Sequence, residues 1–290
     1  MSSQIVNGFG NQATEISMAD FVIGSEPFYA PNGDEVEIFE AAWKQRLPIL
    51  LKGPTGCGKT RFVEYMSWRL GKGRNGSPWP LVAVNCHEDM SAADLVGRYL
   101  LQESGTVWLD GPLTMAVRNG ALCYLDEIVE ARKDTTVVIH SLTDYRRYLP
   151  IERLGTVLGA HDDFMLAISY NPQYQSSLKE LKRSTRQRFT VIEFDYPTIE
   201  KEAVIVARES GVAKEMAERL AVLGSKLRGA QDETGVDPPS TRLLVYAARL
   251  IENGVSPRRA CITSVVNAIT DDPVSTEAGG HIVSAIFPGE

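Results

Sequence analysis

Five short apolar runs punctuate the first two thirds of the chain. Each run is rich in aliphatic or β-branched residues and is bounded by turn-forming residues, which is typical of strands buried on both faces. Helical stretches separate several of the runs, and this alternation predicts an α/β fold on a five-stranded parallel sheet. The predicted strands are Leu47–Lys52, Leu81–Cys86, Ala121–Asp126, Phe164–Asn171 and Thr190–Asp195.

Helical patterns flank this region. A helix is expected to begin at Asp34, with Glu37 three residues later as a capping box. After Pro197 the pattern becomes helical only, so the chain divides into an N-terminal extension (1–33), an α/β domain (34–197) and a helical domain (198–290). The first helix has an apolar face of Ile38, Phe39, Ala42 and Trp43, and the later helices are expected over Thr198–Ser210, Lys214–Arg228, Ser240–Asn253 and from Ser256.

Two further segments interrupt the alternation of strands and helices. Tyr99–Leu109 and Tyr148–Leu158 each hold a pair of short apolar runs around a glycine-containing turn. This arrangement predicts β-hairpins, added to the plain α/β pattern.

Residues 53–60 match the phosphate-binding pattern GxxxxGK[ST]. The match follows a predicted strand and opens a helical stretch, which is the context that the pattern requires. Its glycines let backbone N–H groups curl around phosphate oxygens at a helix N-terminus. We expect ATP here, with Lys59 on the β- and γ-phosphates and the Thr60 hydroxyl on Mg²⁺. The predicted nucleotide-binding residues are Gly53, Pro54, Thr55, Gly56, Cys57, Gly58, Lys59 and Thr60.

The strand Ala121–Asp126 leads into two adjacent carboxylates, Asp126 and Glu127. Neighbouring side chains on a strand point in different directions. Asp126 can therefore hold Mg²⁺ while Glu127 polarises a water, a division of roles that suits NTP hydrolysis. The alternative is a solvated strand end.

Two later polar residues are candidates for contacts with the nucleotide. Asn171 ends a buried strand, where it can orient the attacking water or touch the γ-phosphate; an Asx turn before Pro172 is the alternative. Arg242 lies in the first turn of a predicted helix, where a cation opposes the helix dipole. That small penalty favours a ligand-binding role for Arg242 over an ordinary exposed arginine.

A basic cluster precedes the last predicted strand. It contains Arg183, Arg186 and Arg188. A solvated positive face is the usual explanation of such a run. The functional alternative is an arginine finger, offered to the γ-phosphate of a neighbouring subunit, with Arg188 and Arg186 ranked above Arg183.

Charge and cysteine usage exclude several classes of protein. The net charge is −7, and no Lys or Arg precedes Lys44, which makes a general nucleic-acid binder improbable and leaves no basic leader of the secretory kind. No apolar run is long enough to insert in a membrane. The four cysteines form no CxxC pair, which disfavours a zinc or disulfide framework and fits a reducing cytoplasm.

These features follow the order that AAA+ ATPases show: Walker A, Walker B, sensor 1, arginine finger and sensor 2. The chain resembles the MoxR branch, which carries two hairpin inserts. Within it the segments DLVGRYLLQESGTVWLDGPLTMAVRNGALCYLDEIVEARKDTTVVIHSLTDYRR, SYNPQYQSSLKELKRSTRQRF and STRLLVYAARLI look like the CbbQ/NorQ/NirQ subgroup. The resemblance runs from about Phe21 to the C-terminus; the acidic residues before it have no counterpart.

The resemblance implies a homo-hexameric ATPase with a C-terminal helical lid and a partner bearing a von Willebrand factor A domain, CbbO-like or NorD-like. Reactivation of inhibited Rubisco is the leading target, and maturation of nitric oxide reductase is the alternative. If the hairpins line the pore or a face of such a ring, Leu100 and Leu149 should be exposed; otherwise they belong to the core. A DNA-directed AAA+ protein and a metabolic P-loop kinase are the remaining alternatives.

Overall fold

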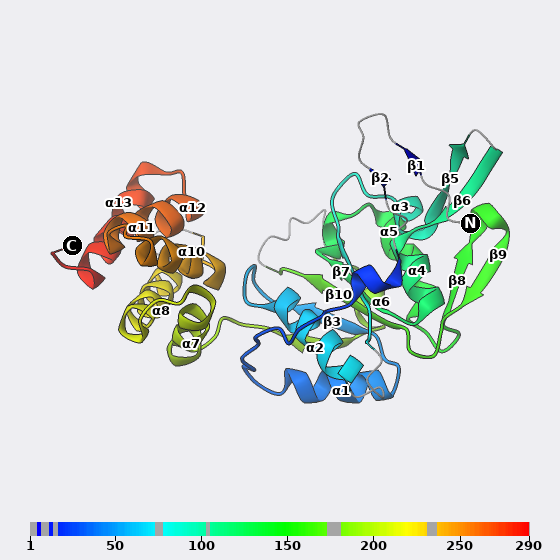
Figure 1. Ribbon diagram of the computed structural model, residues 1–290, viewed down its shortest axis with the longest axis horizontal. Coiled ribbons are helices and arrows are strands. Elements are labelled where there is room, and N and C mark those ends of the chain that lie inside the picture. The colour runs from blue at the N-terminus through cyan, green and yellow to red at the C-terminus, as the bar shows by residue number, and fades with distance from the viewer. Residues whose placement is uncertain are drawn as a thin grey trace.

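The computed structural model describes residues 5–6, 12–13, 17–72, 78–102, 105–172, 181–230 and 237–289. Five parallel strands form the central sheet in the order β11-β3-β10-β7-β4 (Figure 1). The predicted strands are confirmed and differ only at their ends: β3 is Ile49–Lys52, β4 Leu81–Asn85, β7 Leu122–Asp126, β10 Met165–Tyr170 and β11 Thr190–Glu193.

The sheet order brings three predicted site segments to one edge. Strand β10 lies between β3 and β7, with Tyr170 beside Lys52 and Ile168 beside Leu125. Because the strands are parallel, their carboxyl ends meet at the same edge, as ligand sites of open α/β sheets require. The P-loop after β3, the carboxylates after β7 and Asn171 after β10 are therefore neighbours.

Both faces of the sheet are buried, which explains the continuous apolar runs. Alternate strand residues enter two separate cores: Tyr124 packs with Phe39 and Phe62 on one face, while Cys123 packs with Leu95 and Leu113 on the other. The helices of this region are α1 (Glu35–Lys44), α2 (Lys59–Lys72), α3 (Ala92–Val96), α4 (Pro112–Asn119), α5 (Lys133–Val138) and α6 (Arg183–Arg186).

The predicted capping box at the start of α1 is wrong. Asp34 is the N-cap, but its φ of −101° and ψ of 12° are not extended and its side chain makes no capping hydrogen bond. An extended N-cap is what aims the side chain at the helix N–H groups. Glu35 instead accepts hydrogen bonds from the backbone N–H groups of Asn32 and Gly33, both at 2.7 Å.

Both predicted hairpins are present. Strands β5 (Gly97–Gln102) and β6 (Gly105–Asp110) form one, and β8 (Tyr148–Ile151) and β9 (Thr156–Gly159) form the other. Leu149 is fully buried, so the expectation that it is exposed is wrong, whereas Leu100 is half-buried and its neighbour Leu101 is 88% exposed.

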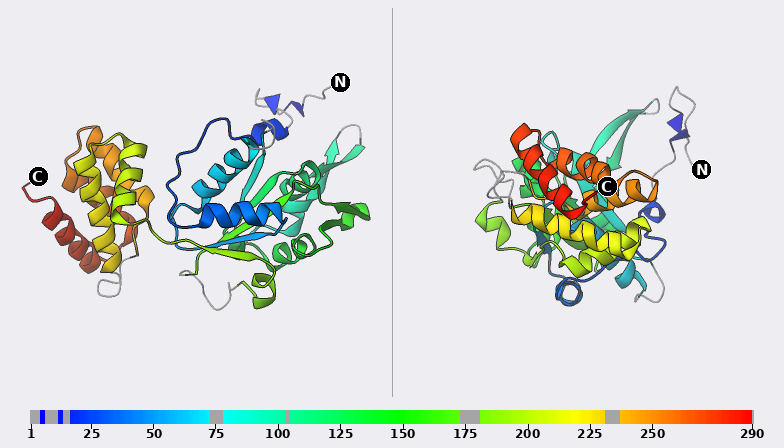
Figure 2. Two further views of the ribbon diagram at one scale, coloured as in Figure 1. Left: turned by 90° about the horizontal axis from the view of Figure 1, so that it is seen from below. Right: turned by 90° about the vertical axis from the view of Figure 1, so that its left-hand side faces the viewer.

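The helical region after β11 lies to one side of the sheet and is joined to it by a single segment (Figures 1 and 2). It has its own core, in which Leu220, Leu244 and Val265 are fully buried. Its elements are α7 (Ile199–Ser210), α8 (Lys214–Gly229), α10 (Thr241–Glu252), α11 (Pro257–Cys261), a π-helical stretch (Ile262–Val266), α12 (Asn267–Ile269) and α13 (Pro273–Ile286).

Predicted bounds agree closely for α7, α8 and α10, but α13 was not singled out by its pattern. Gly279 in the middle of α13 carries no side chain to mark the apolar face. A Cβ at Gly279 would stand 2.9 Å from Val266 Cγ1, so the glycine lets the two segments approach closely.

Candidate nucleotide site

The loop between β3 and α2 has the form that phosphate binding requires. Gly56 and Gly58 adopt positive φ values of 71° and 100°, which favour glycine. A Cβ at Gly53 would lie 2.4 Å from the Phe194 backbone oxygen, and one at Gly56 would lie 2.2 Å from Ser240 Cβ. The glycines therefore have two roles. They allow the backbone conformation of the loop, and they let the segments around Phe194 and Ser240 of the same chain pack against it.

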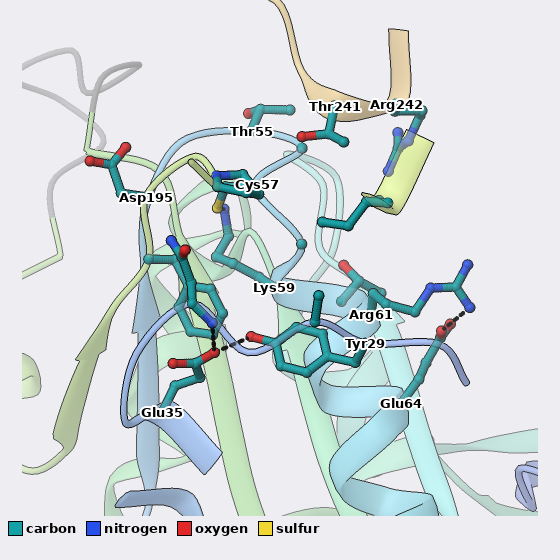
Figure 3. Close-up of a pocket in the computed structure, with 18 of the residues that line it drawn as sticks. Tyr29, Glu35, Thr55, Cys57, Lys59, Arg61, Glu64, Asp195, Thr241 and Arg242 are labelled. Carbon is teal, nitrogen blue, oxygen red and sulfur yellow. Dashed lines mark hydrogen bonds and ion pairs between the residues drawn. The ribbon is translucent and has the colours of Figure 1, made fainter. Parts of the chain in front are cut away.

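Lys59 is held inside this loop. Its Nζ donates to the backbone oxygens of Gly53 and Pro54 at 2.8 and 2.7 Å, and its side chain points toward the loop (Figure 3). Only 8% of Lys59 is exposed. The ammonium therefore already stands within the loop whose backbone would surround phosphates.

Asp126 and Thr60 supply adjacent oxygen donors. Thr60 Oγ1 donates to Asp126 Oδ2 at 3.1 Å. The other oxygen, Oδ1, accepts from the Tyr124 hydroxyl at 2.7 Å and from the Ser169 hydroxyl. A hydroxyl beside one carboxylate is a donor set that suits Mg²⁺, which is usually completed by phosphate oxygens and water.

No cluster of three or more His, Cys, Asp or Glu side chains able to hold a metal occurs among the described residues. The candidate donor set for a cation is therefore the pair of oxygens on Thr60 and Asp126, beside the P-loop, where a nucleotide could supply the remaining ligands. It fits a metal that arrives with a nucleotide better than a resident zinc.

Glu127 stands apart from the strand that carries Asp126. Its φ of 54° places it in the left-handed region, and its N–H donates to Ser169 Oγ at 3.0 Å. Desolvation at the cavity, together with the carboxylates of Asp126 and Glu130, raises the pKa of Glu127. Asp126 ends the strand and Glu127 lies just outside it, so the alternation of strand side chains does not decide how the two acids are oriented.

Ser169 is a site residue that the sequence analysis missed. It bonds to Asp126 and to Glu127, and so it fixes both carboxylate-bearing residues. A signal was available: Ser169 and Asn171 are two residues apart at the end of an apolar strand, so they face the same side. Asn171 Nδ2 donates to Thr55 Oγ1 at 3.0 Å, which places Asn171 beside the P-loop.

The helical region forms one wall of the site. A cavity of about 920 Å³ is lined by P-loop residues, by Asp126 and Glu127, and by Thr241, Arg242 and Val245 of α10. Arg242 is exposed and lies on the helical-region side of the cavity, across from the loop (Figure 3). The Arg61 guanidinium of α2 lies 3.7 Å from the Glu209 carboxylate of α7, and this ion pair also joins α2 to the helical region.

Residues assigned to the extension also line this cavity, among them Phe28 and Tyr29. The Tyr29 hydroxyl donates to Glu35 Oε1 at 2.6 Å. Burial and this hydrogen bond to a carboxylate raise the pKa of Tyr29 well above its usual value. Burial opposes the charge of Glu35, but the bonds from Tyr29, Asn32 and Gly33 outweigh it and lower the pKa of Glu35.

The basic cluster is not part of this cavity. Neither Arg183 and Arg186, on α6, nor Arg188 is among its lining residues. Arg188 Nη1 lies 3.9 Å from the Asp144 carboxylate, which Arg146 already engages through several hydrogen bonds. Burial and the charge of Arg188 lower the pKa of the nearby His140.

All four cysteines lie among the described residues, are buried and form no disulfide. Burial raises the pKa of the Cys57 thiol in the P-loop. Burial, with the carboxylates of Asp126 and Glu127, raises that of Cys86 to about 12. Both shifts favour the neutral thiol over the thiolate at neutral pH.

Comparison with known proteins agrees with this geometry. Residues 48–189 match the family described as AAA domain (dynein-related subfamily). Together with the P-loop and the carboxylates beside it, the match defines the protein as a AAA+ ATPase, an enzyme that hydrolyses ATP. Residues 202–286 match the family described as CbbQ/NirQ/NorQ C-terminal.

Three curated relatives match over nearly their whole length. Protein CbbQ of Hydrogenophilus thermoluteolus is 56% identical over 87% of this chain and 92% of its own. Denitrification regulatory protein NirQ of Pseudomonas aeruginosa is 54% identical over 89% and 96%, and Protein NorQ of Paracoccus denitrificans is 54% identical over 90% and 94%. The chain belongs to the CbbQ/NirQ/NorQ family of AAA+ ATPases.

Among the described helices, none combines the length and the apolar character that a membrane crossing requires.

Proposed function

We propose that ATP binds with Mg²⁺ in the cavity at the P-loop and drives the remodelling of a target protein. The backbone of Gly53, Pro54, Thr55, Gly56, Cys57 and Gly58 surrounds the phosphates, and Lys59 exchanges its two carbonyl partners for phosphate oxygens. Thr60 and Asp126 hold the metal, which neutralises charge on the phosphates. The observation that carries this proposal is the convergence of Lys59, Asp126, Glu127 and Arg242 on one cavity.

Within this site the polar residues divide the work of hydrolysis. Glu127 polarises the attacking water as general base, and Asn171 orients it from the end of β10. Arg242 contacts the nucleotide from the helical side. The apolar residues Phe28, Ile205 and Val245 line the same cavity and suit the face of a base ring. The segment before α1 therefore belongs to the nucleotide domain rather than to an inert extension.

We propose that a further positive charge at the γ-phosphate, an arginine side chain, comes from a neighbouring subunit of a hexameric ring. Support comes from the position of the arginine cluster, since neither Arg183, Arg186 nor Arg188 lines the cavity of its own chain. An arginine supplied in trans contributes on the order of 10³–10⁵ in rate in other NTPases. Arg188 is our first choice for this finger.

Mixing two inactive variants tests the ring. Arg188→Ala should bind ATP almost normally and hydrolyse it very slowly, and Lys59→Ala should fail to bind ATP. In mixed assemblies some interfaces pair an intact P-loop with an intact finger, so part of the ATPase activity should return. If subunit exchange is shown by fluorescence transfer and no activity returns, Arg188 is not the finger, and Arg186 is tested by the same cross.

We infer that the remodelled target is inhibited Rubisco, with a partner that carries a von Willebrand factor A domain. The support is the resemblance to the CbbQ type and the 56% identity to Protein CbbQ. The alternative is maturation of nitric oxide reductase, supported by the 54% identities to NirQ and NorQ. Four cysteines that form no disulfide support the cytoplasm as the place of action.

Reactivation of Rubisco is the test of the target. Inhibited Rubisco is mixed with this protein, a CbbO-like partner and ATP, and the recovery of carboxylation is followed, with the Glu127→Gln variant as control. Recovery that depends on ATP supports the proposal. No recovery, together with an ATP-dependent gain of nitric oxide reductase activity when the partner is NorD-like, would favour the alternative.

A further inference from the structure

A chain of contacts leads from the P-loop into the helical region. Tyr196 lies on the segment that joins β11 to α7, the single connection visible in Figure 1. Its hydroxyl donates to the backbone oxygen of Thr55 at 3.2 Å. On its other side, the Arg228 guanidinium of α8 lies 3.9 Å from the centre of the Tyr196 ring, within the range of a cation–π contact.

Each guanidinium nitrogen of Arg228 donates a hydrogen bond. Its Nη1 and Nη2 donate to the two oxygens of Glu202 at 2.8 and 2.7 Å, and its Nε donates to the Pro239 oxygen at 2.9 Å. The side chains of Arg228 and Glu202 are only 12% and 1% exposed. A planar guanidinium binds a carboxylate in this bidentate manner. Its orientation over Tyr196 is therefore set by Glu202 of α7 and by Pro239, just before α10.

The same network holds the start of α10. Glu202 Oε1 also accepts from Thr241 Oγ1 at 2.6 Å, and Thr241 directly precedes Arg242. The bond to Pro239 restrains the residues just before the helix, where Ser240 meets Gly56. The position of Arg242 over the P-loop is therefore set by groups that also hold Tyr196.

We propose that Tyr196 and Arg228 are positioning residues that fix Arg242 relative to the phosphates and link the position of Thr55 to that of α10. Replacing a buried ion pair by apolar residues is often neutral for stability. The Arg228–Glu202 pair by itself is therefore no evidence of a functional role. The Tyr196 hydroxyl, however, donates to the main chain of the phosphate loop, and so it joins this network to the P-loop. This inference rests on the proposed contact of Arg242 with the nucleotide.

The test is a double-mutant cycle between Tyr196→Phe and Arg242→Ala. Phenylalanine keeps the ring beneath Arg228 and removes the hydroxyl that donates to Thr55. The quantities measured are kcat, KM and the Kd for ADP. We expect Tyr196→Phe to lower kcat several-fold in the otherwise unchanged protein and to have no further effect in Arg242→Ala, because residues that act through one another are not additive.

Arg228→Lys is the second variant, with Arg219→Lys as its matched control. Arg219 is also on α8, lies 4.3 Å from the Phe287 ring centre and donates to the Ile286 oxygen at 2.9 Å, and these two residues lie near the C-terminal end of the chain. Both variants should shift the melting temperature. Only Arg228→Lys should lower kcat, and its effect should likewise vanish in Arg242→Ala.

The outcomes separate the two proposals. Equal effects of Tyr196→Phe with and without Arg242, or no effect on kcat at all, would overturn the positioning role and leave the role of Arg242 intact. Unchanged turnover and ADP affinity in Arg242→Ala alone would refute the proposed contact of Arg242 with the nucleotide, and the positioning role with it.

Discussion

A methyl group added to the P-loop at Gly56 should separate the nucleotide domain from the helical region. An ideal Cβ at Gly56 would lie 2.2 Å from Ser240 Cβ and 2.9 Å from Ser240 Oγ. Neither atom is at the free end of a long side chain, so the start of α10 must move. The φ of 71° adds strain of its own, because residues with a Cβ rarely adopt it.

The two costs can be separated. An alanine in the left-handed region costs about 1–2 kcal/mol, and forcing extra carbon into a packed contact costs about 1–3 kcal/mol more. Gly58→Ala is the matched control, since Gly58 has a φ of 100° and no atom within 4 Å of its added Cβ. Gly58→Ala should therefore show the strain alone, whereas Gly56→Ala should show strain and clash.

Thermal unfolding without nucleotide measures the difference. At roughly 2–4 °C per kcal/mol for a domain of 150–250 residues, Gly56→Ala should melt at least 2 °C below Gly58→Ala. Adding Ser240→Gly should recover this difference, because the Ser240 side chain makes no capping bond whose loss would matter. If Gly56→Ala and Gly58→Ala melt together, or Ser240→Gly restores nothing, the two regions do not meet at Gly56.

Other variants address the chemistry and the hairpins. Lys59→Ala should abolish ATP binding, whereas Glu127→Gln should keep it and lose roughly 10²–10⁴-fold in turnover, the usual contribution of a general base; near-normal turnover in both variants would remove the assignment. Desolvation and the charge of Asp126 raise the pKa of Glu127, and a base must be deprotonated, so the ATPase rate should decline with falling pH before an ordinary carboxylate titrates. A rate that stays flat down to about pH 4.3, the usual value for Glu, would contradict this. Leu149→Ser, at a fully buried position, should melt several degrees lower, whereas Leu101→Ser, at an 88% exposed position, should keep its melting temperature and impair remodelling more than basal ATPase; equal melting temperatures would contradict this.

Local pattern sufficed for much of the architecture. The strands could be predicted because both faces of the sheet are buried, which leaves apolar runs with turn residues at each end. The P-loop could be predicted because its chemistry depends on residue types at a fixed spacing. Leu149 could not be placed from its hairpin pattern, since alternation identifies two faces of a hairpin and does not say which one a neighbouring helix covers.

Contacts between segments far apart in the sequence could not be predicted from the pattern of residues. The segment before α1 carries no strong periodicity, yet Lys201 Nζ of α7 donates to the backbone oxygens of Pro31 and Asn32 at 2.7 and 3.1 Å. These contacts use main-chain oxygens, which every residue possesses, so no residue type announces them. The bond from Tyr196 to Thr55 is of the same kind.

This limit explains why charged residues around the cavity could be singled out from the sequence, whereas the buried network at the start of α10 could not. Lys59, Asp126 and Arg242 are recognisable because charge at those positions is unusual and chemically specific. What fixes Arg242 in space is a buried Arg228–Glu202 pair, and from sequence alone each member resembles an exposed charge on a helix. Glu202 even falls in the first turn of α7, where an acid is expected for its interaction with the helix dipole. Only the folded chain reveals that Glu202 binds two groups around the start of α10, so functional residues of this kind must be sought among buried charges rather than among motifs.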